Sequence, residues 1–252
     1  AARRDRPVDG VAVVVLERGT GSVVAMAGSD SFRDKPFNAA LAHRPAGSTL
    51  KPFLYALALE RGAMGIEGQV SDHPAKFGSY EPKNFSDDFL GAMRASDALS
   101  ESRNLPAVHL LNSLGIGEFA DFLAGHGLRV PPGELGLDLA LGSLAVSPLE
   151  LATAYQRLFG PGNLLVSVAS RDAVMKALSH RSPGAEQLPS EMVAWKTGTS
   201  SGRRDAWCVG ISHSHIVTVW LGNLNGRGHP DLVGSTSARP LMVDIMARLV
   251  TP

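Results

Sequence analysis

The chain has 252 residues, of which 44% are hydrophobic and 19% charged, so it is a globular protein with a substantial core and is not intrinsically disordered. Its 24 basic and 24 acidic residues give a net charge of zero, which gives no electrostatic reason to expect nucleic acid as a partner. The single cysteine, Cys208, excludes an internal disulfide, and its apolar strand-like surroundings predict a buried small side chain.

The first third of the chain begins with two β-branched runs, 10–17 and 22–28. The turn-forming segment 18–21 separates them, so they predict a β-hairpin. Residues 36–47 are loop-like. A helix is predicted from Ser48 to Arg61, because Pro52 is tolerated only in the first turn of a helix and Gly62 favours a stop.

The middle of the chain opens with residues 63–95, which are rich in Gly, Pro, Asp and Asn and predict irregular structure. Apolar spacing then predicts short helices over 96–103, 105–114, 117–127 and 148–159. Ser147 and Pro148 are typical of a helix start.

The last part of the chain returns to strands, predicted over 192–196, 206–212 and 216–222, and ends in a helix over 240–249. Strands at both ends with helices between them predict an α/β (α+β) fold, in which both chain ends build one antiparallel five-stranded sheet flanked by helices. We expect a single domain, 1–252, with a sheet lobe at about 7–47 and 186–252, a helical lobe at about 62–185, and a site in the cleft between them.

Three short motifs occur once each in the sequence. They are Ser48-Thr49-Leu50-Lys51, Ser102-Arg103-Asn104 and Lys196-Thr197-Gly198. A Ser-x-x-Lys or Ser-x-Asn pattern alone is weak, since roughly one copy of each is expected by chance in this composition. A Lys-Thr-Gly tripeptide is expected only about 0.02 times. The order and spacing of all three therefore indicate one active site.

Ser48 and Lys51 lie three residues apart at a predicted helix start, so their side chains share one face. A serine hydroxyl becomes a good nucleophile when a base takes its proton. Lys51 can be that base only if burial or a second cation lowers its pKa, and we expect Lys196 to be that cation.

The remaining motif residues supply the partners of this reaction. Ser102 is expected to relay a proton toward the leaving amine, and Asn104 to hydrogen-bond Lys51 and a substrate amide. Thr197, Gly198 and Thr199 follow Lys196 on a strand edge, which can align an extended peptide and bind its carboxylate. The backbone N–H groups of Ser48 and Thr199 are expected to form an oxyanion hole.

With these motifs, the chain resembles the transpeptidase domain of class A penicillin-binding proteins, most closely the 1C-type subgroup, whose fold is shared with serine β-lactamases. The resemblance covers essentially the whole chain. It rests on the segments 44–53, 102–108, 141–152, 195–207 and 228–241.

The resemblance implies a D,D-transpeptidase. Ser48 would attack the D-Ala–D-Ala bond of a peptidoglycan stem peptide, release D-Ala and pass the acyl group to an amine on a neighbouring stem. β-Lactams would acylate the same serine. No cofactor, metal or nucleic acid is implied, and the expected location is the periplasm or the extracytoplasmic face of the membrane.

Family members of class A carry a glycosyltransferase domain and a membrane anchor ahead of this domain. No apolar run here approaches the ~18 residues of a membrane span, and the chain starts directly in structured-looking sequence. We therefore expect a domain excised from a longer protein, with anchor and export signal outside this sequence.

Other functions compatible with the motifs are a D,D-carboxypeptidase, a class A-like β-lactamase and a non-catalytic β-lactam sensor. A β-lactamase of this class needs a Glu-x-x-Leu-Asn segment, whereas residues 134–138 read Glu-Leu-Gly-Leu-Asp and lack the asparagine. A sensor keeps the motifs and forms a stable acyl-enzyme.

Several further residues invite a functional interpretation. His213 and His215 share a strand face but have no third ligand nearby, so a polar turn is expected instead of a metal site. Asp205 is expected to pair with a neighbouring arginine, Arg203 or Arg204. Residues expected at the cleft border are Tyr80 and Asn84; Trp195 and Trp207 are expected in the core or the cleft wall.

Overall fold

The computed structural model describes residues 8–28, 37–133, 135–162, 165–179 and 193–250. A five-stranded sheet in the order β2-β1-β9-β8-β7 runs through it, and all its neighbouring strands are antiparallel. The strands are β1 (Gly10–Glu17), β2 (Val23–Ala27), β7 (Ala194–Thr199), β8 (Asp205–Ile211) and β9 (His215–Gly222). The predicted sheet built from both chain ends is therefore confirmed.

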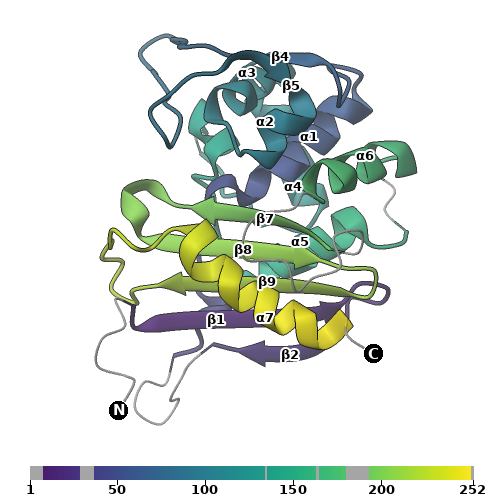
Figure 1. The fold of residues 1–252 in the computed structure, drawn as a ribbon, viewed down its shortest axis with the longest axis vertical. Helices are drawn as coiled ribbons and strands as arrows, with labels where there is room; N and C mark the ends of the chain where they lie inside the picture. The colour runs from purple at the N-terminus through teal and green to yellow at the C-terminus, as the bar shows by residue number, and fades with distance from the viewer. Residues whose placement is uncertain (1–7, 29–36, 134, 163–164, 180–192, 251–252) are drawn as a thin grey trace.

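Helices cover both faces of this sheet. α7 (Arg239–Val250) crosses one face and α5 (Pro148–Phe159) packs on the other (Figure 1). Every residue of β8 is buried as a result, including Cys208 as predicted. A strand covered on both faces needs a continuous apolar run instead of alternation, which is what the sequence of β8 provides.

The start of α5 follows the sequence prediction. The hydroxyl of Ser147 accepts from the backbone N–H of Glu150 at 3.1 Å, and the Glu150 carboxylate accepts from the N–H of Ser147 at 2.8 Å. This reciprocal capping box satisfies two of the N–H groups that a helix start leaves open.

The remaining α-helices form a lobe beyond the β7 edge of the sheet (Figure 1). They are α1 (Lys51–Glu60), α2 (Ala95–Ser100), α3 (Asn104–Leu114), α4 (Ile116–Gly125) and α6 (Val168–Leu178). The sequence analysis made no prediction for α6. The predicted helix 96–103 is too long, because α2 ends at Ser100 and Ser102 adopts a left-handed φ of +63°.

Short elements connect these parts. They are the 3-10 helices η1 (Ala39–Leu41), η2 (Gly47–Leu50), η3 (Leu137–Leu141) and η4 (Ser201–Arg203), the π-helical turn η5 (Gly234–Ala238), and the strand pairs β3 (Arg44–Pro45) with β6 (Ala145–Val146) and β4 (Gln69–Asp72) with β5 (Gly91–Arg94). The prediction that 63–95 is irregular is thus wrong for β4 and β5. The predicted helix start at Ser48 is a 3-10 turn, and α1 begins three residues later.

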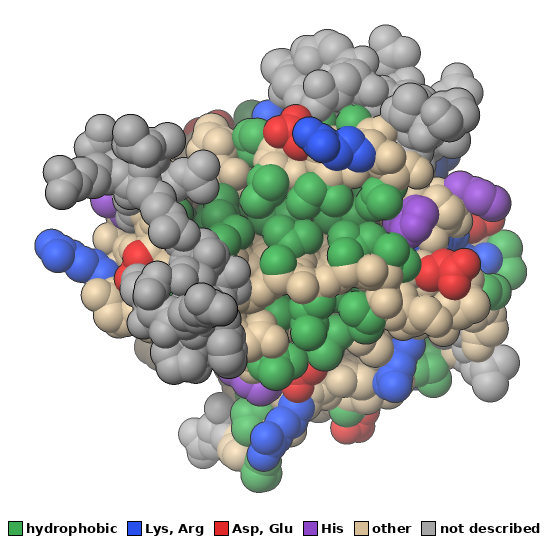
Figure 2. Space-filling view, turned by 90° about the horizontal axis from the view of Figure 1, so that it is seen from below, with side chains coloured by type: hydrophobic (Ala, Val, Ile, Leu, Met, Phe, Trp, Pro, Cys, Tyr) green, Lys and Arg blue, Asp and Glu red, His purple; other side chains and the backbone are tan. Residues whose placement is uncertain are grey.

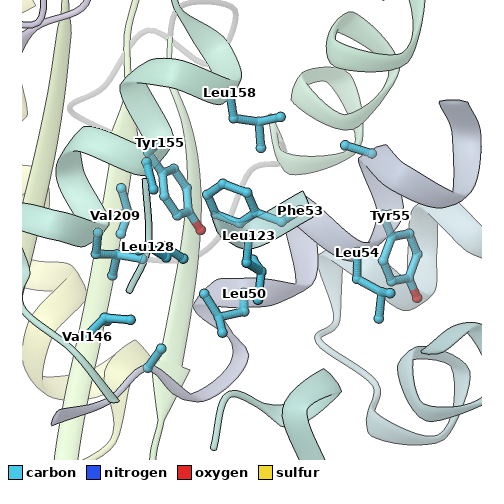
Figure 3. Packing of buried hydrophobic residues seen from close by; sticks show 14 of the residues in the cluster. Leu50, Phe53, Leu54, Tyr55, Leu123, Leu128, Val146, Tyr155, Leu158 and Val209 are labelled. Atoms are coloured by element: carbon cyan, nitrogen blue, oxygen red, sulfur yellow. The ribbon is translucent and has the colours of Figure 1, made fainter. Parts of the chain in front are cut away.

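α1 lies in the middle of the core and is buried on nearly all sides. The ring of Phe53 meets that of Tyr155 edge-on, with centroids 5.2 Å apart, and both contact aliphatic side chains from α4, α5 and the sheet (Figure 3). An all-round apolar helix is typical of a central position. The residue that begins it, Lys51, is therefore buried as well.

The sheet ends in β2 on the side opposite the helical lobe. All five residues of β2 are exposed, among them Val23, Val24 and Met26. Hydrophobic side chains gather on this side of the molecule (Figure 2). None of the helices in the described residues is long and apolar enough to cross a membrane.

Candidate active site

The turn that carries Ser48 is held on two sides by buried contacts. Its Gly47 N–H donates to the carbonyl of Gly142 at 3.0 Å, and the hydroxyl of Tyr155 donates to the carbonyl of Thr49 at 2.6 Å. Ser48 itself is half-buried, and its hydroxyl makes no hydrogen bond within the described residues. The turn is fixed while its hydroxyl stays available to a substrate.

The backbone of this turn packs directly on β7. Gly47 has a φ of +56°, and a Cβ at this position would lie 2.9 Å from the backbone nitrogen of Thr199. Only glycine fits so close an approach at positive φ. Gly47, which contacts Thr199, directly precedes Ser48 in the chain. Ser48 and Thr199 are the two residues predicted to supply the N–H groups of the oxyanion hole.

Lys51 is completely buried and reaches the second motif. Its Nζ donates to the carbonyl of Ser102 at 2.6 Å, to the carbonyl of Arg103 at 3.0 Å and to Oδ1 of Asn104 at 2.7 Å. These three acceptors use all three N–H bonds of an ammonium group. The predicted hydrogen bond between Asn104 and Lys51 is present.

Lys196 meets the same turn from the opposite side. Its Nζ donates to the hydroxyl of Ser102 at 2.7 Å and to the carbonyl of Thr197 at 3.1 Å. Ser102 lies between α2 and α3, as predicted, and therefore stands between the two lysines: its carbonyl accepts from Lys51 and its hydroxyl from Lys196.

The two lysines have lowered pKa values. Burial, followed by the positive charges of Lys196 and Arg103, holds the pKa of Lys51 well below its ordinary value. Burial lowers the pKa of Lys196 from 10.5 to about 7. The neutral form that a general base requires is thus accessible to Lys196 near neutral pH, and it is favoured in Lys51 relative to an ordinary lysine.

Most of the motif residues line one cleft of about 1340 Å³ beside the β7 edge, whereas Lys51 does not line it. Ser48, Ser102, Asn104 and residues 196–199 contribute to its wall. The rest of the wall that carries charge comprises Glu101, Asp138, Arg203, Arg204, His229 and Arg239. The lining residues fall in six separate segments, 45–48, 80–85, 100–104, 138–143, 195–204 and 228–239, which converge on a site large enough for a peptide.

The hydroxyl of Thr199 is engaged within the protein. It accepts from the backbone N–H of Gly234 at 3.0 Å, whereas no hydrogen bond of the Thr197 hydroxyl is found in the described residues. Gly198 lets β7 approach the serine turn, since a Cβ there would lie 2.7 Å from the carbonyl oxygen of Ala46. Of these neighbours, Thr197 offers the freer hydroxyl to a ligand.

The family described as the penicillin binding protein transpeptidase domain matches residues 11–170, which is more than half of the chain. The chain belongs to this family. It is a transpeptidase domain homologous to the class A penicillin-binding proteins, as the motifs predicted.

Individual relatives agree with this assignment. Penicillin-binding protein 1C of Escherichia coli is 33% identical over 223 residues, which are 79% of this chain and 29% of that protein. This chain spans about a third of the length of the other curated relatives that it matches.

Solved structures share the fold. Penicillin-binding protein 1A of Haemophilus influenzae superposes with a TM-score of 0.89 at 21% identity, covering 97% of this chain and 48% of that one. PonA1 of Mycobacterium tuberculosis in complex with penicillin V gives a TM-score of 0.84 at 23% identity, covering 97% and 79%.

Of the remaining sequence predictions for the transpeptidase domain, some are confirmed and others are wrong. Tyr80 and Trp195 line the cleft and Trp207 is in the core, but Asn84 does not line the cleft and is buried behind it. Asp205 forms no ion pair within the described residues. Its carboxylate accepts from the Ser200 hydroxyl at 2.7 Å and from Trp220 Nε1 at 3.0 Å.

Two further predictions concern a deacylating glutamate and a metal. Glu134, the position compared with the glutamate of β-lactamases, lies outside the described residues. The described residues hold no group of three or more His, Cys, Asp or Glu side chains that would bind a metal ion.

Sequence reasoning missed the residues behind the second motif. Asp72 is fully buried, and its Oδ2 accepts from Nε of Arg103 at 2.8 Å; Asp88 accepts from the same guanidinium at 2.9 Å. Arg103 stands inside the Ser-x-Asn motif, at the position taken as variable. Asp72 is 31 residues away in a segment read as irregular, and no local pattern marks it.

Proposed function

We propose that this domain is a D,D-transpeptidase that cross-links peptidoglycan stem peptides through an acyl-enzyme on Ser48. The supporting observation is the convergence of Lys51, Ser102, Asn104 and Lys196 by hydrogen bonds beside a cleft that Ser48 lines. Each group needed for acyl transfer to and from a serine has a counterpart in this cluster.

Acylation begins with proton transfer from the Ser48 hydroxyl to neutral Lys51. Loss of one proton from the Lys51 ammonium frees a lone pair and gives up one of its three hydrogen bonds. The new lone pair accepts the Ser48 proton as Oγ bonds to the penultimate D-Ala carbonyl carbon. The lowered pKa of Lys51 makes its neutral form more available than that of an ordinary lysine.

Collapse of the tetrahedral intermediate breaks the bond to the terminal D-Ala. Ser102 is the proton donor to the leaving nitrogen, and its hydroxyl regains a proton through Lys51 or Lys196, whose Nζ already donates to it. The backbone N–H groups of Ser48 and Thr199 stabilise the oxyanion. An acceptor amine then reverses these steps and forms the cross-link.

The outer edge of β7 would hold the donor peptide. Among the described residues β7 pairs with β8 alone and ends the sheet, so its other edge can accept an extended chain. Lys196 and the Thr197 hydroxyl would bind the terminal carboxylate, and Asn104 a substrate amide. Penicillins carry a carboxylate beside an amide, so β-lactams are proposed ligands of the same cleft. The proposed location of the domain is the extracytoplasmic side of the membrane.

The experiment incubates the domain with a stem-peptide mimic ending in D-Ala-D-Ala, with and without an added amine acceptor. A transpeptidase releases D-Ala and forms the amide with the acceptor, both lost in Ser48→Ala and both retained in Ser113→Ala, an exposed serine on α3. Release without amide formation would make the domain a carboxypeptidase.

The same preparation separates the remaining alternatives. Rapid, repeated turnover of a chromogenic cephalosporin would indicate a β-lactamase, and a stable β-lactam adduct without D-Ala release would indicate a sensor. Either outcome contradicts the transpeptidase proposal.

A further inference from the structure

The acceptors that hold Lys51 all come from one strained turn. They are two successive carbonyls, of Ser102 and Arg103, and the side chain of Asn104. Ser102 has a φ of +63°, which is unfavourable for a residue with a Cβ. Such a conformation persists only where surrounding contacts hold it.

One set of contacts reaches this turn through Arg103. Its side chain is only 7% exposed. The guanidinium contacts the buried carboxylate of Asp72 through Nε at 2.8 Å and Nη2 at 2.6 Å, and Asp88 through Nη1 at 2.9 Å. Arg103 is thus clamped between two carboxylates.

A second set reaches the turn through Asn84. Its amide nitrogen donates to Oδ1 of Asp72 at 2.8 Å, and its Oδ1 accepts from the backbone N–H of Asn104 at 2.7 Å. Asp72 therefore contacts the turn by two routes, one through Arg103 and one through Asn84. It lies on β4, one layer behind the cleft, and does not line it.

We propose that Asp72 is a positioning residue for acyl transfer. Through Arg103 and Asn84 it holds the turn 102–104, whose carbonyls and Asn104 side chain bind Lys51. The Ser102 hydroxyl of the same turn is thereby held against Lys196. This inference rests on the proposed function of the cleft. It adds a layer of charged groups that act on the general base without touching the substrate.

The charges of this layer have opposite effects on the base. The groups that act on Lys51 are Lys196 from β7, Arg103 from the turn and Asp72 from β4; the two cations lower the pKa of Lys51 and Asp72 raises it. Tyr55, one turn further along α1, stays neutral, since burial and the charge of Asp72 raise the pKa of its hydroxyl. Removing the charge of Asp72 should therefore lower the pKa of Lys51, and removing the charge of Arg103 should raise it.

The experiment measures the second-order rate constant of acylation by a fluorescent penicillin from pH 5 to pH 10. In Asp72→Asn the acid limb should move to lower pH by about 0.5 to 1 unit. In Arg103→Gln it should move to higher pH by a similar amount. The plateau rate should fall roughly tenfold or more in both, since the turn loses its support.

Controls keep this test independent of folding. Urea unfolding gives the pH range in which each variant is fully folded, and only rate constants from that range are compared, because rapid exchange with unfolded chains would lower the observed rate. Asp88→Asn, at an exposed partner of Arg103, should give a smaller shift of the Asp72→Asn sign. Asp97→Asn and Arg94→Gln, which remove an exposed ion pair on neighbouring residues, should leave the profile unchanged.

The outcomes separate the two proposals. A wild-type chain that is never labelled overturns the function of the cleft and this inference with it. A labelled wild type whose Asp72→Asn and Arg103→Gln variants keep its pH midpoint overturns the positioning role alone, as would shifts of the same sign in both variants.

Discussion

Lys51 and Lys196 are buried amines that contact the same residue, Ser102. Neither forms an ion pair with a carboxylate in the described part of the chain. Two buried ammonium groups without a carboxylate partner are unfavourable, so the site favours a state in which at least one amine is neutral. Burial lowers the pKa of both amines, and the positive charges of Lys196 and Arg103 lower that of Lys51 further.

A consequence of this arrangement is a pH-dependent stability. The pKa of Lys196 is about 7 in the folded chain and 10.5 in its ordinary state, so between these values the unfolded chain binds more protons. Stability therefore rises with pH in this window. Between pH 7 and 9 the free energy of unfolding of the wild type should rise relative to that of Lys196→Met by up to about 1.4 kcal/mol per pH unit.

Urea unfolding of both chains at a series of pH values measures this difference. The range stops at pH 9 because burial raises the pKa of Cys208 to about 12, which acts in the opposite direction at higher pH. Parallel stability curves for the two chains would show that Lys196 is not desolvated as the structure indicates.

At the scale of residues, the sequence motifs predicted which side chains meet but not what holds them. The hydrogen bond between Lys51 and Asn104 was predicted from the motifs. The contact of Lys196 with Ser102 joins two residues that the motifs assigned to the same active site. The contact of Arg103 with Asp72 joins residues whose pairing depends on how β4 folds back on the turn. No local spacing encodes such a tertiary ion pair.

Among the elements, the 3-10 turn η2 and the strand β7 depend on each other. Gly47 has its α-carbon against the backbone of Thr199, and the carbonyl of Gly47 lies where a Cβ of Gly142 would be. Three backbone segments are therefore packed without side chains between them. This close contact sets the distance between Ser48 and β7.

Gly47→Ala should slow acylation by roughly a hundredfold or more, because a Cβ would push η2 away from β7 and misplace Ser48. Gly62→Ala is a matched control: Gly62 also has positive φ, +64°, but a Cβ there would meet nothing within 4 Å. Gly62→Ala should cost about 1–2 kcal/mol of stability for its positive φ alone, and Gly47→Ala should cost more because its Cβ also meets the Thr199 backbone. The labelling rate with a fluorescent penicillin and urea unfolding test both effects; equal labelling rates would refute the packing argument.

The elements themselves were predictable where their signals are local. Pro52 indicated a helix start close by, although α1 begins at Lys51 and not at Ser48, and Ser147 with Pro148 marked the start of α5. The pairing of Gln69–Asp72 with Gly91–Arg94 was missed, because these short segments are largely polar and bracket a turn-rich loop. The helix end at Ser100 was missed because the left-handed Ser102 carries no glycine signal.

On the scale of the whole molecule, the site exists because strands from opposite chain ends join one sheet. β1 pairs with β9 along its full length, which brings β7 to one edge and the helical lobe against it (Figure 1). The five-stranded sheet was predictable from strand runs at both ends of the sequence. The cleft follows from this topology, because a strand has one open side when it lies at the edge of the sheet, as β7 does.

Mass spectrometry of the intact domain after exposure to a penicillin tests the central claim most directly. Acylation opens the β-lactam ring without a leaving group, so one complete penicillin mass should be added per chain. Peptide mapping should find it on the Ser48 hydroxyl, and Ser48→Ala should remain unmodified while still folded. An adduct on another residue, an adduct retained in Ser48→Ala, or no adduct on the wild type would contradict the account.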